Sequence, residues 1–375
     1  GKHILVVRIN RPFSYLFPAS RFPKTIEVWN CRGEQTFVVA SLPLQDNIPI
    51  EGVPTGPRSV TWQPNQPATL TWLDALDEGD PRNTVPYRDR ISGLTAPFNS
   101  APSELCTGIL WGEKDGLAFV RDYDRDRRWT RTLQINTEQP DETPTLIWER
   151  SINDRYADPG TPMIRPLPNG QTVMWQHGNF LFLRSIGATP KGDRPFMDRY
   201  DLTTHESKRL FECSDESYES VVALIADDGS AFLTQHESPI DPANVFLYVE
   251  GKSRSALTSF QDPMPQLRGI HKELVTYERS DGVPLSFTLY LPPGYQKGTP
   301  LPTIVWAYPR EFNDPSTAGQ VSGSANRFTT ISGISHLFLL TQGYAILDEA
   351  TMPVVGAPDV ANDTFIEQVV ASAEA

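Results

Sequence analysis

One short segment of the sequence combines a predicted strand with polar residues that could contact a substrate. Thr303 to Tyr308 is an apolar run bounded by prolines, and Arg310 follows Tyr308 by two positions. In open α/β sheets the ligand crevice lies at the carboxyl ends of the strands. A tyrosine there would direct its hydroxyl at a developing oxyanion, as a fixed donor in a dry pocket. The alternative is a strand-terminal tyrosine that packs on the next loop, and residue chemistry alone favours this alternative.

Other groups that catalysis would need are missing from the sequence. The turn G-x-S-x-G, which exposes a nucleophilic serine, does not occur; Gly333-Ile-Ser335-His336 comes nearest, but Leu337 stands where the second glycine should be. The histidines form no HExxH or His-x-His spacing, the cysteines no zinc spacing, and phosphate-binding glycine motifs are absent. We therefore predict no metal and no cofactor, and interpret His336 as a satisfied core or helix histidine.

The elements that would position Tyr308 begin after a change of character near Pro263. The expected elements are strands at 273–278, 285–291, 303–308 and 344–347, a turn at Asp281-Gly282 and a helix near 332–341. Near-continuous apolar strands that alternate with a helix are typical of an α/β sheet covered on both faces. The sequence therefore predicts a second domain at 267–375, of which only the first part is present.

Upstream of this domain, a turn that opens a strand recurs along the chain. Its copies stand at Gly1, Asn65-Gln66, Asp115-Gly116, Asn169-Gly170 and Asp228-Gly229. Asn-Gly and Asp-Gly signal hairpins because both central residues need positive φ. Hairpin units repeating at roughly 40–50 residues or more are typical of β-propeller blades, and unrelated hairpins of a β-sandwich are the alternative. The ordered copies favour a propeller over residues 1–266.

Composition and charge exclude several classes of protein. Proline is 34 of 375 residues, which excludes a mostly helical fold and fits a chain with many loops. The formal net charge of −13 argues against a nucleic-acid partner. Residues 328–347 are uncharged, but polar residues interrupt them, so a buried helix and strand are expected there rather than a membrane span.

Both ends of the chain are expected to be cuts through a longer protein. Gly1 leads directly into an apolar strand, so the propeller is predicted to be truncated at its N-terminus. Asn362 to Ala375 is predicted to be a helix, because Thr364 and Glu367 match a capping box and apolar residues line one face. No glycine, proline or basic last turn ends this helix.

The same segments resemble a known family of serine peptidases. Asp281 to Tyr295 (DGVPLSFTLYLPPGY) is similar to the entry of the peptidase domain in the prolyl oligopeptidase family. The segments Trp306–Phe312 (WAYPREF), Ala318–Ser324 (AGQVSGS) and Asn362–Ala375 narrow the resemblance to its glutamyl endopeptidase branch, known from plant chloroplasts and bacteria. The similarity is specific from about Glu273 onward and looser upstream.

This resemblance implies a fold and an activity. The family joins an N-terminal β-propeller, which restricts access, to a C-terminal α/β-hydrolase domain, so the chain would be a partial β-propeller followed by the first part of an α/β-hydrolase domain. Family members hydrolyse peptides with a Ser-His-Asp triad, and their nucleophile elbow follows the helix that begins here at Asn362. None of the three residues is therefore expected in this chain, and the chain alone is predicted to be inactive.

The resemblance also implies roles for two residues. Tyr308 matches the tyrosine whose hydroxyl, with a backbone N–H beside the serine, forms the family's oxyanion hole. Pro-Arg-Glu follows it here, where relatives often show Gly-Gly or Ala-Gly-Pro. Cleavage after Glu would need a cationic pocket, to which Arg310, or alternatively Arg8 or Arg11, would contribute; a solvated surface arginine is the alternative for each.

Two other functions stay open from the sequence. One is a non-catalytic propeller that serves as a binding or scaffold module, and the other is an acylaminoacyl-peptidase or esterase on the same fold. A peptide is the implied partner of the peptidase, and the sequence does not predict an oligomeric state. An exported or periplasmic location is favoured for a bacterial source and the chloroplast stroma for a plant source.

Overall fold

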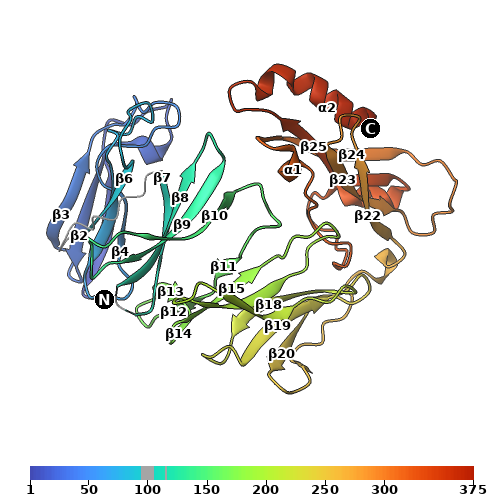
Figure 1. Cartoon of the computed structure of the whole chain (residues 1–375), viewed down its shortest axis with the longest axis horizontal. Helices are drawn as coiled ribbons and strands as arrows, with labels where there is room; N and C mark the ends of the chain where they lie inside the picture. The colour runs from blue at the N-terminus through green and yellow to red at the C-terminus, as the bar shows by residue number, and fades with distance from the viewer. Residues whose placement is uncertain (94–104, 115) are drawn as a thin grey trace. The chain divides into compact units, whose positions relative to one another are not determined.

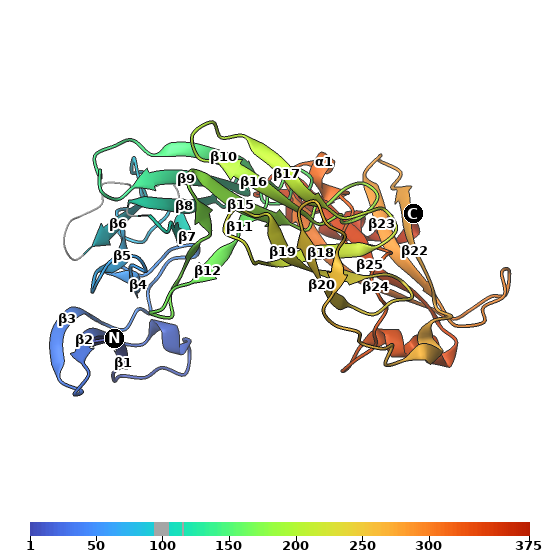
Figure 2. The ribbon, with the colours of Figure 1, turned by 90° about the horizontal axis from the view of Figure 1, so that it is seen from below.

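The computed structural model describes residues 1–93, 105–114 and 116–375, which form mostly antiparallel sheets with few helices (Figures 1 and 2). The chain divides into two compact units. The first comprises residues 1–125, 129–149 and 164–176, and the second comprises residues 126–128, 150–163 and 177–375. Among the described residues, no helix is long and apolar enough to cross a membrane.

The first unit consists of antiparallel sheets whose neighbouring strands are also consecutive in the sequence. The strands are β1 (His3–Ile9), β2 (Lys24–Asn30) and β3 (Gln35–Leu42) in one sheet; β4 (Arg58–Trp62), β5 (Leu70–Ala75) and β6 (Asp89–Gly93) in another; β7 (Leu105–Trp111), β8 (Leu117–Asp124), β9 (Trp129–Asn136) and β10 (Thr145–Ser151) in a third; and β12 (Ile164–Pro166) with β13 (Thr172–Met174). Leu73, Ile91, Trp111, Val120 and Val173 pack into one core cluster, so apolar residues of three of these sheets bury one another.

The predicted glycines do lie in turns between strands, but the turn type differs from the predicted hairpin turn. Gly170 and Gly229 have φ of +81° and +80°, whereas Asn169 and Asp228 do not share the positive φ that the hairpin interpretation required for both central residues. Instead, the Asn169 Oδ1 accepts a hydrogen bond from the Gln171 N–H at 3.0 Å, and the Asp228 Oδ1 accepts one from Ser230 at 2.9 Å. The short polar side chain therefore closes an Asx-type turn. In the third copy Gly116 has φ of +87°, and Asp115 lies outside the described residues.

The second unit begins with two further antiparallel sheets. They consist of β11 (Thr161–Pro162), β14 (Gln176–His177), β15 (Phe180–Ser185), β16 (Phe196–Asp201) and β17 (Ser207–Glu212), then of β18 (Tyr218–Leu224), β19 (Ala231–Glu237), β20 (Asn244–Val249) and β21 (Ser255–Ala256). Strands β18, β19 and β20 lie side by side in sequence order (Figure 1). The fully buried Phe182, Tyr200 and Phe232 mark the core of these sheets.

The rest of the second unit is a mixed sheet in the strand order β22-β23-β25-β24. Its elements are η2 (Pro265–Leu267), β22 (His271–Glu278), β23 (Pro284–Leu291), β24 (Thr303–Phe312), α1 (Pro315–Ala318), η3 (His336–Gln342), β25 (Ala345–Val355), η4 (Ala361–Thr364) and α2 (Phe365–Glu374). β24 and β25 are parallel, while β22, β23 and β25 pair antiparallel. All four predicted strands are confirmed, and the last two extend further than predicted.

The predicted helix before β25 is a 3-10 helix in the structure rather than an α-helix. The Ser335 hydroxyl caps its start by accepting a hydrogen bond from the Leu337 N–H, and Gly343 ends it in the left-handed region with φ of +83°. Its Leu340 is buried with Tyr290 and Ile346. This segment carries the chain from β24 to the parallel strand β25, which a direct hairpin cannot do.

Helix α2 confirms the helix predicted at the C-terminal end of the sequence, without the predicted capping box. The Thr364 hydroxyl accepts a hydrogen bond from the Gln368 side chain at 2.9 Å instead of capping a backbone N–H. Gln368 also donates to the Val355 carbonyl and accepts from the Val355 N–H. The same glutamine therefore fixes the first turn of α2 against the end of β25, which it adjoins in Figure 1.

A buried arginine joins three parts of the mixed sheet. The Arg279 side chain is 1% exposed and makes a two-pronged ion pair with Asp281, with both contacts at 2.8 Å. It also donates to the Pro353 carbonyl of β25 and to the Ser372 hydroxyl of α2. The hydrogen bonds that the guanidinium donates to Asp281 lower the pKa of this carboxyl group below its ordinary value. Arg279 therefore connects the β22–β23 turn to β25 and α2.

Candidate functional site

An irregularity in the parallel pair shapes the surface around Tyr308. Val305 pairs with Leu347 and Ala307 pairs with Ala350, so one residue of β24 lies opposite two of β25. Within this bulge Glu349 has φ of +52°, a conformation that a residue with a side chain adopts rarely. Bulges occur often beside active sites because they redirect side chains. Here the bulge brings exposed Glu349 to the rim of a cavity.

Both residues predicted from the sequence line this cavity, which has a volume of about 320 Å³. Tyr308 and Arg310 belong to β24, and Glu349 and Thr351 belong to β25. Tyr308 is 80% exposed, and β24 continues to Phe312, so the strand does not end at the tyrosine as predicted. With this exposure, Tyr308 does not pack on the next loop, which was the alternative from the sequence.

Neither polar group has a partner among the residues that the structure describes. Within the described ranges, the Tyr308 hydroxyl and the Arg310 guanidinium make no hydrogen bond or ion pair with another residue. A side chain held by a strand but without a partner can donate to a ligand without first breaking an internal bond. The cavity thus presents one neutral and one cationic donor, separated by Pro309 on the same strand.

The opposite wall of the cavity is fixed by a glutamine that follows α1. The Gln320 Oε1 accepts hydrogen bonds from the backbone N–H groups of Arg155 and Tyr156, at 2.6 and 3.2 Å, and its amide donates to Asp154. The Tyr156 hydroxyl in turn accepts from the Val321 N–H at 2.8 Å. These bonds hold the segment after α1 against residues 153–156, which also line the cavity in part.

Arg155 is engaged on the other side of this wall. Its guanidinium lies 3.2 Å from Asp193, which also accepts a hydrogen bond from the Gly323 N–H. Burial raises the pKa of Asp193, and the cation of Arg155 acts against that shift. Arg155 is therefore paired, whereas Arg310 is the cavity arginine that stays available to a ligand.

The end of β24 is anchored just past Arg310. The Arg128 guanidinium contacts the Glu311 carboxylate at 2.6 Å and donates to the Glu311 carbonyl at 2.7 Å. Arg128 itself has φ of +50°. Glu311 is thus neutralised, so it does not cancel the charge of its neighbour Arg310.

Trp306 and His336 form the base of the bulge. Their rings stack with centroids 4.4 Å apart, and the His336 Nε2 lies 2.7 Å from the Asp348 Oδ1. His336 is therefore satisfied, as predicted, and its neighbour Ser335 caps η3 rather than standing on a nucleophile elbow. Among the described residues, no group of three or more His, Cys, Asp or Glu side chains is placed to hold a metal ion.

The structure places the two alternative arginines in other contacts. Arg8 pairs with buried Glu27 at 2.8 Å, and the Arg11 guanidinium lies 5.6 Å from the centre of the Phe13 ring. Sequence reasoning missed Glu349, Gln320 and Arg155 as cavity residues. The segment AGQVSGS, which contains Gln320, was noticed only for its resemblance, and a bulge in a parallel ladder has no local sequence signal.

A cavity beside a parallel strand pair, with an exposed hydroxyl and an exposed cation, is the kind of place at which α/β sheets bind polar ligands. The comparisons with known proteins narrow this class. No family model matches the chain. Over its whole length it is 38% identical to two plant proteins named "Probable glutamyl endopeptidase, chloroplastic", from Oryza sativa subsp. japonica and Arabidopsis thaliana. The chain spans 43% and 42% of the length of these relatives. The predicted resemblance to the glutamyl endopeptidases is thereby confirmed along the entire chain.

Proposed function

We propose that residues 1–266 form β-propeller blades and that residues 267–375 form the first part of an α/β-hydrolase domain. Antiparallel sheets whose strands follow one another in the sequence support the first assignment, since a blade is such a sheet. The parallel pair β24–β25, joined by a crossover after an antiparallel hairpin, supports the second. In this arrangement the blades restrict access to the hydrolase site.

We further propose that the whole protein is a serine-type peptidase that hydrolyses short peptides after glutamate. The names of both relatives and their 38% identity support this activity. The reacting Ser, His and Asp would come from sequence that the relatives have beyond the matched part, because the chain contains no G-x-S-x-G. For a plant source we propose the chloroplast, the compartment that the relatives' names give for those proteins.

Tyr308 would stabilise the charge that develops when the serine attacks a peptide carbonyl. The observation that carries this role is its exposed hydroxyl, which has no partner in the described part of the chain and lies at the cavity. A donor that is already in place gains more from an oxyanion than from a neutral carbonyl, so it lowers the barrier to the reaction. The strand and the bulge beside it hold the donor in place.

Arg310 would bind the side-chain carboxylate of the glutamate before the cut bond. A guanidinium recognises a carboxylate through two parallel hydrogen bonds. Arg155 and Arg128 are already paired with Asp193 and Glu311, so Arg310 is the cavity cation left for this task. Glu349 lies on the same rim and would repel a second acidic group of the substrate.

The activity is tested with the full-length protein and a fluorophosphonate probe, which labels activated serines. We expect labelling, together with faster hydrolysis of Glu-linked than of Pro- or Ala-linked chromogenic peptides and of simple esters. No labelling would favour a non-catalytic propeller module, and faster ester or Ala hydrolysis would favour an esterase or acylaminoacyl-peptidase. The 375-residue chain alone is expected to be neither labelled nor active.

A further inference from the structure

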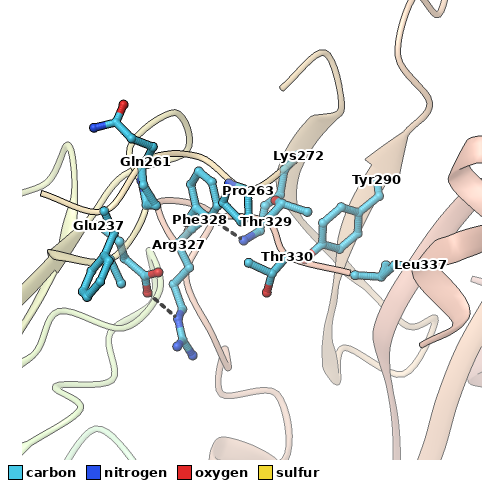
Figure 3. Close-up of a pocket in the computed structure, with 13 residues that line it drawn as sticks. Glu237, Gln261, Pro263, Lys272, Tyr290, Arg327, Phe328, Thr329, Thr330 and Leu337 are labelled. Atoms are coloured by element: carbon cyan, nitrogen blue, oxygen red, sulfur yellow. Dashed lines mark hydrogen bonds and ion pairs between the residues drawn. The ribbon is translucent and has the colours of Figure 1, made fainter. Parts of the chain in front are cut away.

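A second, larger cavity lies in the same unit and shares no lining residue with the Tyr308 cavity. Its volume is about 700 Å³. Figure 3 shows Lys272 of β22 and Tyr290 of β23 facing the loop that carries Phe328, Thr329 and Thr330. The end of β19 contributes Glu237, and the segment before β22 contributes further wall residues. Nothing in the proposed peptidase activity uses this cavity.

Lys272 is a half-buried cation that has no carboxylate partner among the described residues. Its ammonium donates to the Arg327 carbonyl at 3.3 Å and lies 5.6 Å from the centre of the Tyr290 ring. No carboxylate lies within ion-pair distance of it in the described part of the chain. Taking an ammonium out of water is costly unless an anion compensates it. Burial accordingly lowers the pKa of Lys272 to about 8, and the nearby Arg327 adds to this shift.

Other charges around this cavity are already matched. Arg327 pairs with Glu237 at 3.0 Å, the contact drawn as a dashed line in Figure 3. Arg268, whose guanidinium lies 3.7 Å from the centre of the Phe328 ring, pairs with Asp262 at 2.7 Å. Lys272 is thus the one lining cation of the described residues that lacks an acidic partner.

Tyr290 supplies a second unused donor. It pairs with Lys272 across the β22–β23 ladder and is 7% exposed, yet its hydroxyl has no hydrogen-bond partner among the residues that the structure describes. Burial raises its pKa, so the hydroxyl stays protonated and can donate. Two donors of neighbouring strands therefore line a space whose remaining wall includes the apolar side chains of Phe260, Pro263, Phe328 and Leu337.

We propose that this cavity binds an amphipathic carboxylate, with the carboxylate on the Lys272 ammonium and the Tyr290 hydroxyl and the apolar body against Phe260, Pro263, Phe328 and Leu337. A carboxylate accepts from both donors at once, and it supplies the negative charge that Lys272 lacks. A free organic acid and the C-terminal carboxylate of a short apolar peptide share this chemistry.

The first test varies the ligand and leaves the protein unchanged. Isothermal titration calorimetry of the 375-residue chain compares hexanoate with hexanamide, which has nearly the same shape and no charge. We expect hexanoate to bind about tenfold more tightly or more, as a charge-assisted hydrogen bond predicts. The same comparison is made between N-acetyl-Leu-Phe and its C-terminal amide. Whichever of the two acids binds more tightly shows whether the cavity prefers a free organic acid or a peptide C-terminus. Equal affinities of acid and amide in both pairs, or no binding of either acid, would overturn the proposal.

The second test locates the binding. Lys272→Met keeps the length of the side chain and removes the charge, and we expect it to weaken hexanoate binding by about tenfold. Lys297→Met, at an exposed lysine of the β23–β24 loop, is the matched control and should bind as the wild type does. Unchanged affinity in Lys272→Met would contradict the site. Tyr290→Phe should weaken hexanoate severalfold and leave hexanamide unaffected.

A pH titration separates a charge effect from a change of shape. Glu237, Asp348, Arg327 and Tyr290 surround Lys272. Burial raises the pKa of Tyr290 and lowers that of Lys272 to about 8, so between pH 7 and 9.5 Lys272 is the group of interest that loses its proton. Hexanoate affinity should fall about tenfold over this range in the wild type and stay constant in Lys272→Met. A pH-independent wild type would overturn the role of the ammonium.

Discussion

Arg279 and Arg310 belong to the same mixed sheet and represent opposite uses of a guanidinium. Arg279 is buried, and its donors are bound to Asp281, Pro353, Gln368 and Ser372. Arg310 lies exposed at a cavity with no partner in the described chain. An arginine whose donors are all bound within the fold holds elements together, whereas an arginine without such partners can bind a ligand. Lys272 lies between the two, since it is half-buried and its ammonium contacts a carbonyl and an aromatic ring but no carboxylate of the described residues.

The largest expected effect on stability comes from Arg279. Arg279→Met removes the arginine donor to the Pro353 carbonyl and the Ser372 hydroxyl, and one of the two donors to the Gln368 side chain. We therefore expect a loss of about 3 to 4 kcal/mol in the free energy of unfolding. Urea unfolding followed by circular dichroism measures it. Arg310→Met is the matched control and should change stability by less than about 0.5 kcal/mol. Equal losses of stability in both variants would show that the buried hydrogen bonds of Arg279 do not stabilise the sheet.

A smaller, pH-dependent effect is expected at Lys272. Its pKa in the folded chain is about 8, against 10.5 for the free group, so between these values the unfolded state binds more protons. Stability therefore rises with pH across this window, and the cost of the buried ammonium is fully present below pH 8. We expect Lys272→Met to exceed the wild type by about 2 kcal/mol at pH 7, after allowance for partial solvent exposure, and less at pH 10.

Urea unfolding of both proteins at the two pH values checks this expectation. A gap between variant and wild type that stays constant from pH 7 to pH 10 would show that the ammonium of Lys272 is not destabilised in the fold. Lys297→Met, at an exposed lysine, should give no pH-dependent gap.

A still smaller effect is expected at the bulge. Glu349 has φ of +52°, where glycine is relaxed and a side chain is strained. Glu349→Gly should raise the free energy of unfolding by about 0.5 kcal/mol, because relief of strain exceeds the added freedom of the unfolded chain. Glu349→Ala keeps the strain while it removes the charge, and serves as the control. A loss of stability in the glycine variant and not in the alanine variant would contradict the strain.

Arg310 is expected to affect selectivity with almost no effect on stability. In the full-length protein, Arg310→Gln should lower kcat/KM for Glu-linked peptides about tenfold to a hundredfold and leave Gln-linked peptides nearly unchanged. Paired rate measurements on the two substrates check the ratio. A proportional loss on both substrates would assign Arg310 a role other than carboxylate recognition.

Local patterns in the sequence predicted the elements that carry the site. The proline-bounded apolar run predicted the strand that carries Tyr308. Asp281-Gly282 predicted the turn before β23, and the apolar face of residues 365–373 predicted α2. These patterns did not predict where the strand of Tyr308 ends. β24 continues past Tyr308 because pairing with β25 stabilises Pro309 to Phe312, whose sequence alone is not strand-like.

The remaining features depend on residues far apart in the sequence. Arg279 meets Ser372 only after β25 and α2 are in place, and Gln320 contacts the backbone of Arg155 and Tyr156 across more than 160 residues. The strained Glu349 follows from a register shift between two strands. Such contacts have no periodicity or motif, so neither the wall of the Tyr308 cavity nor the Lys272 cavity was predictable from the sequence.

Tyr308 is proposed to donate to the oxyanion of a peptidase. The most direct measurement is kcat, KM and urea stability of Tyr308→Phe in the full-length protein with a Glu-linked peptide. We predict that kcat falls about a hundredfold or more, as for the loss of one oxyanion donor, with KM and stability nearly unchanged. An unchanged kcat, or a loss that follows a matching loss of stability, would contradict this role.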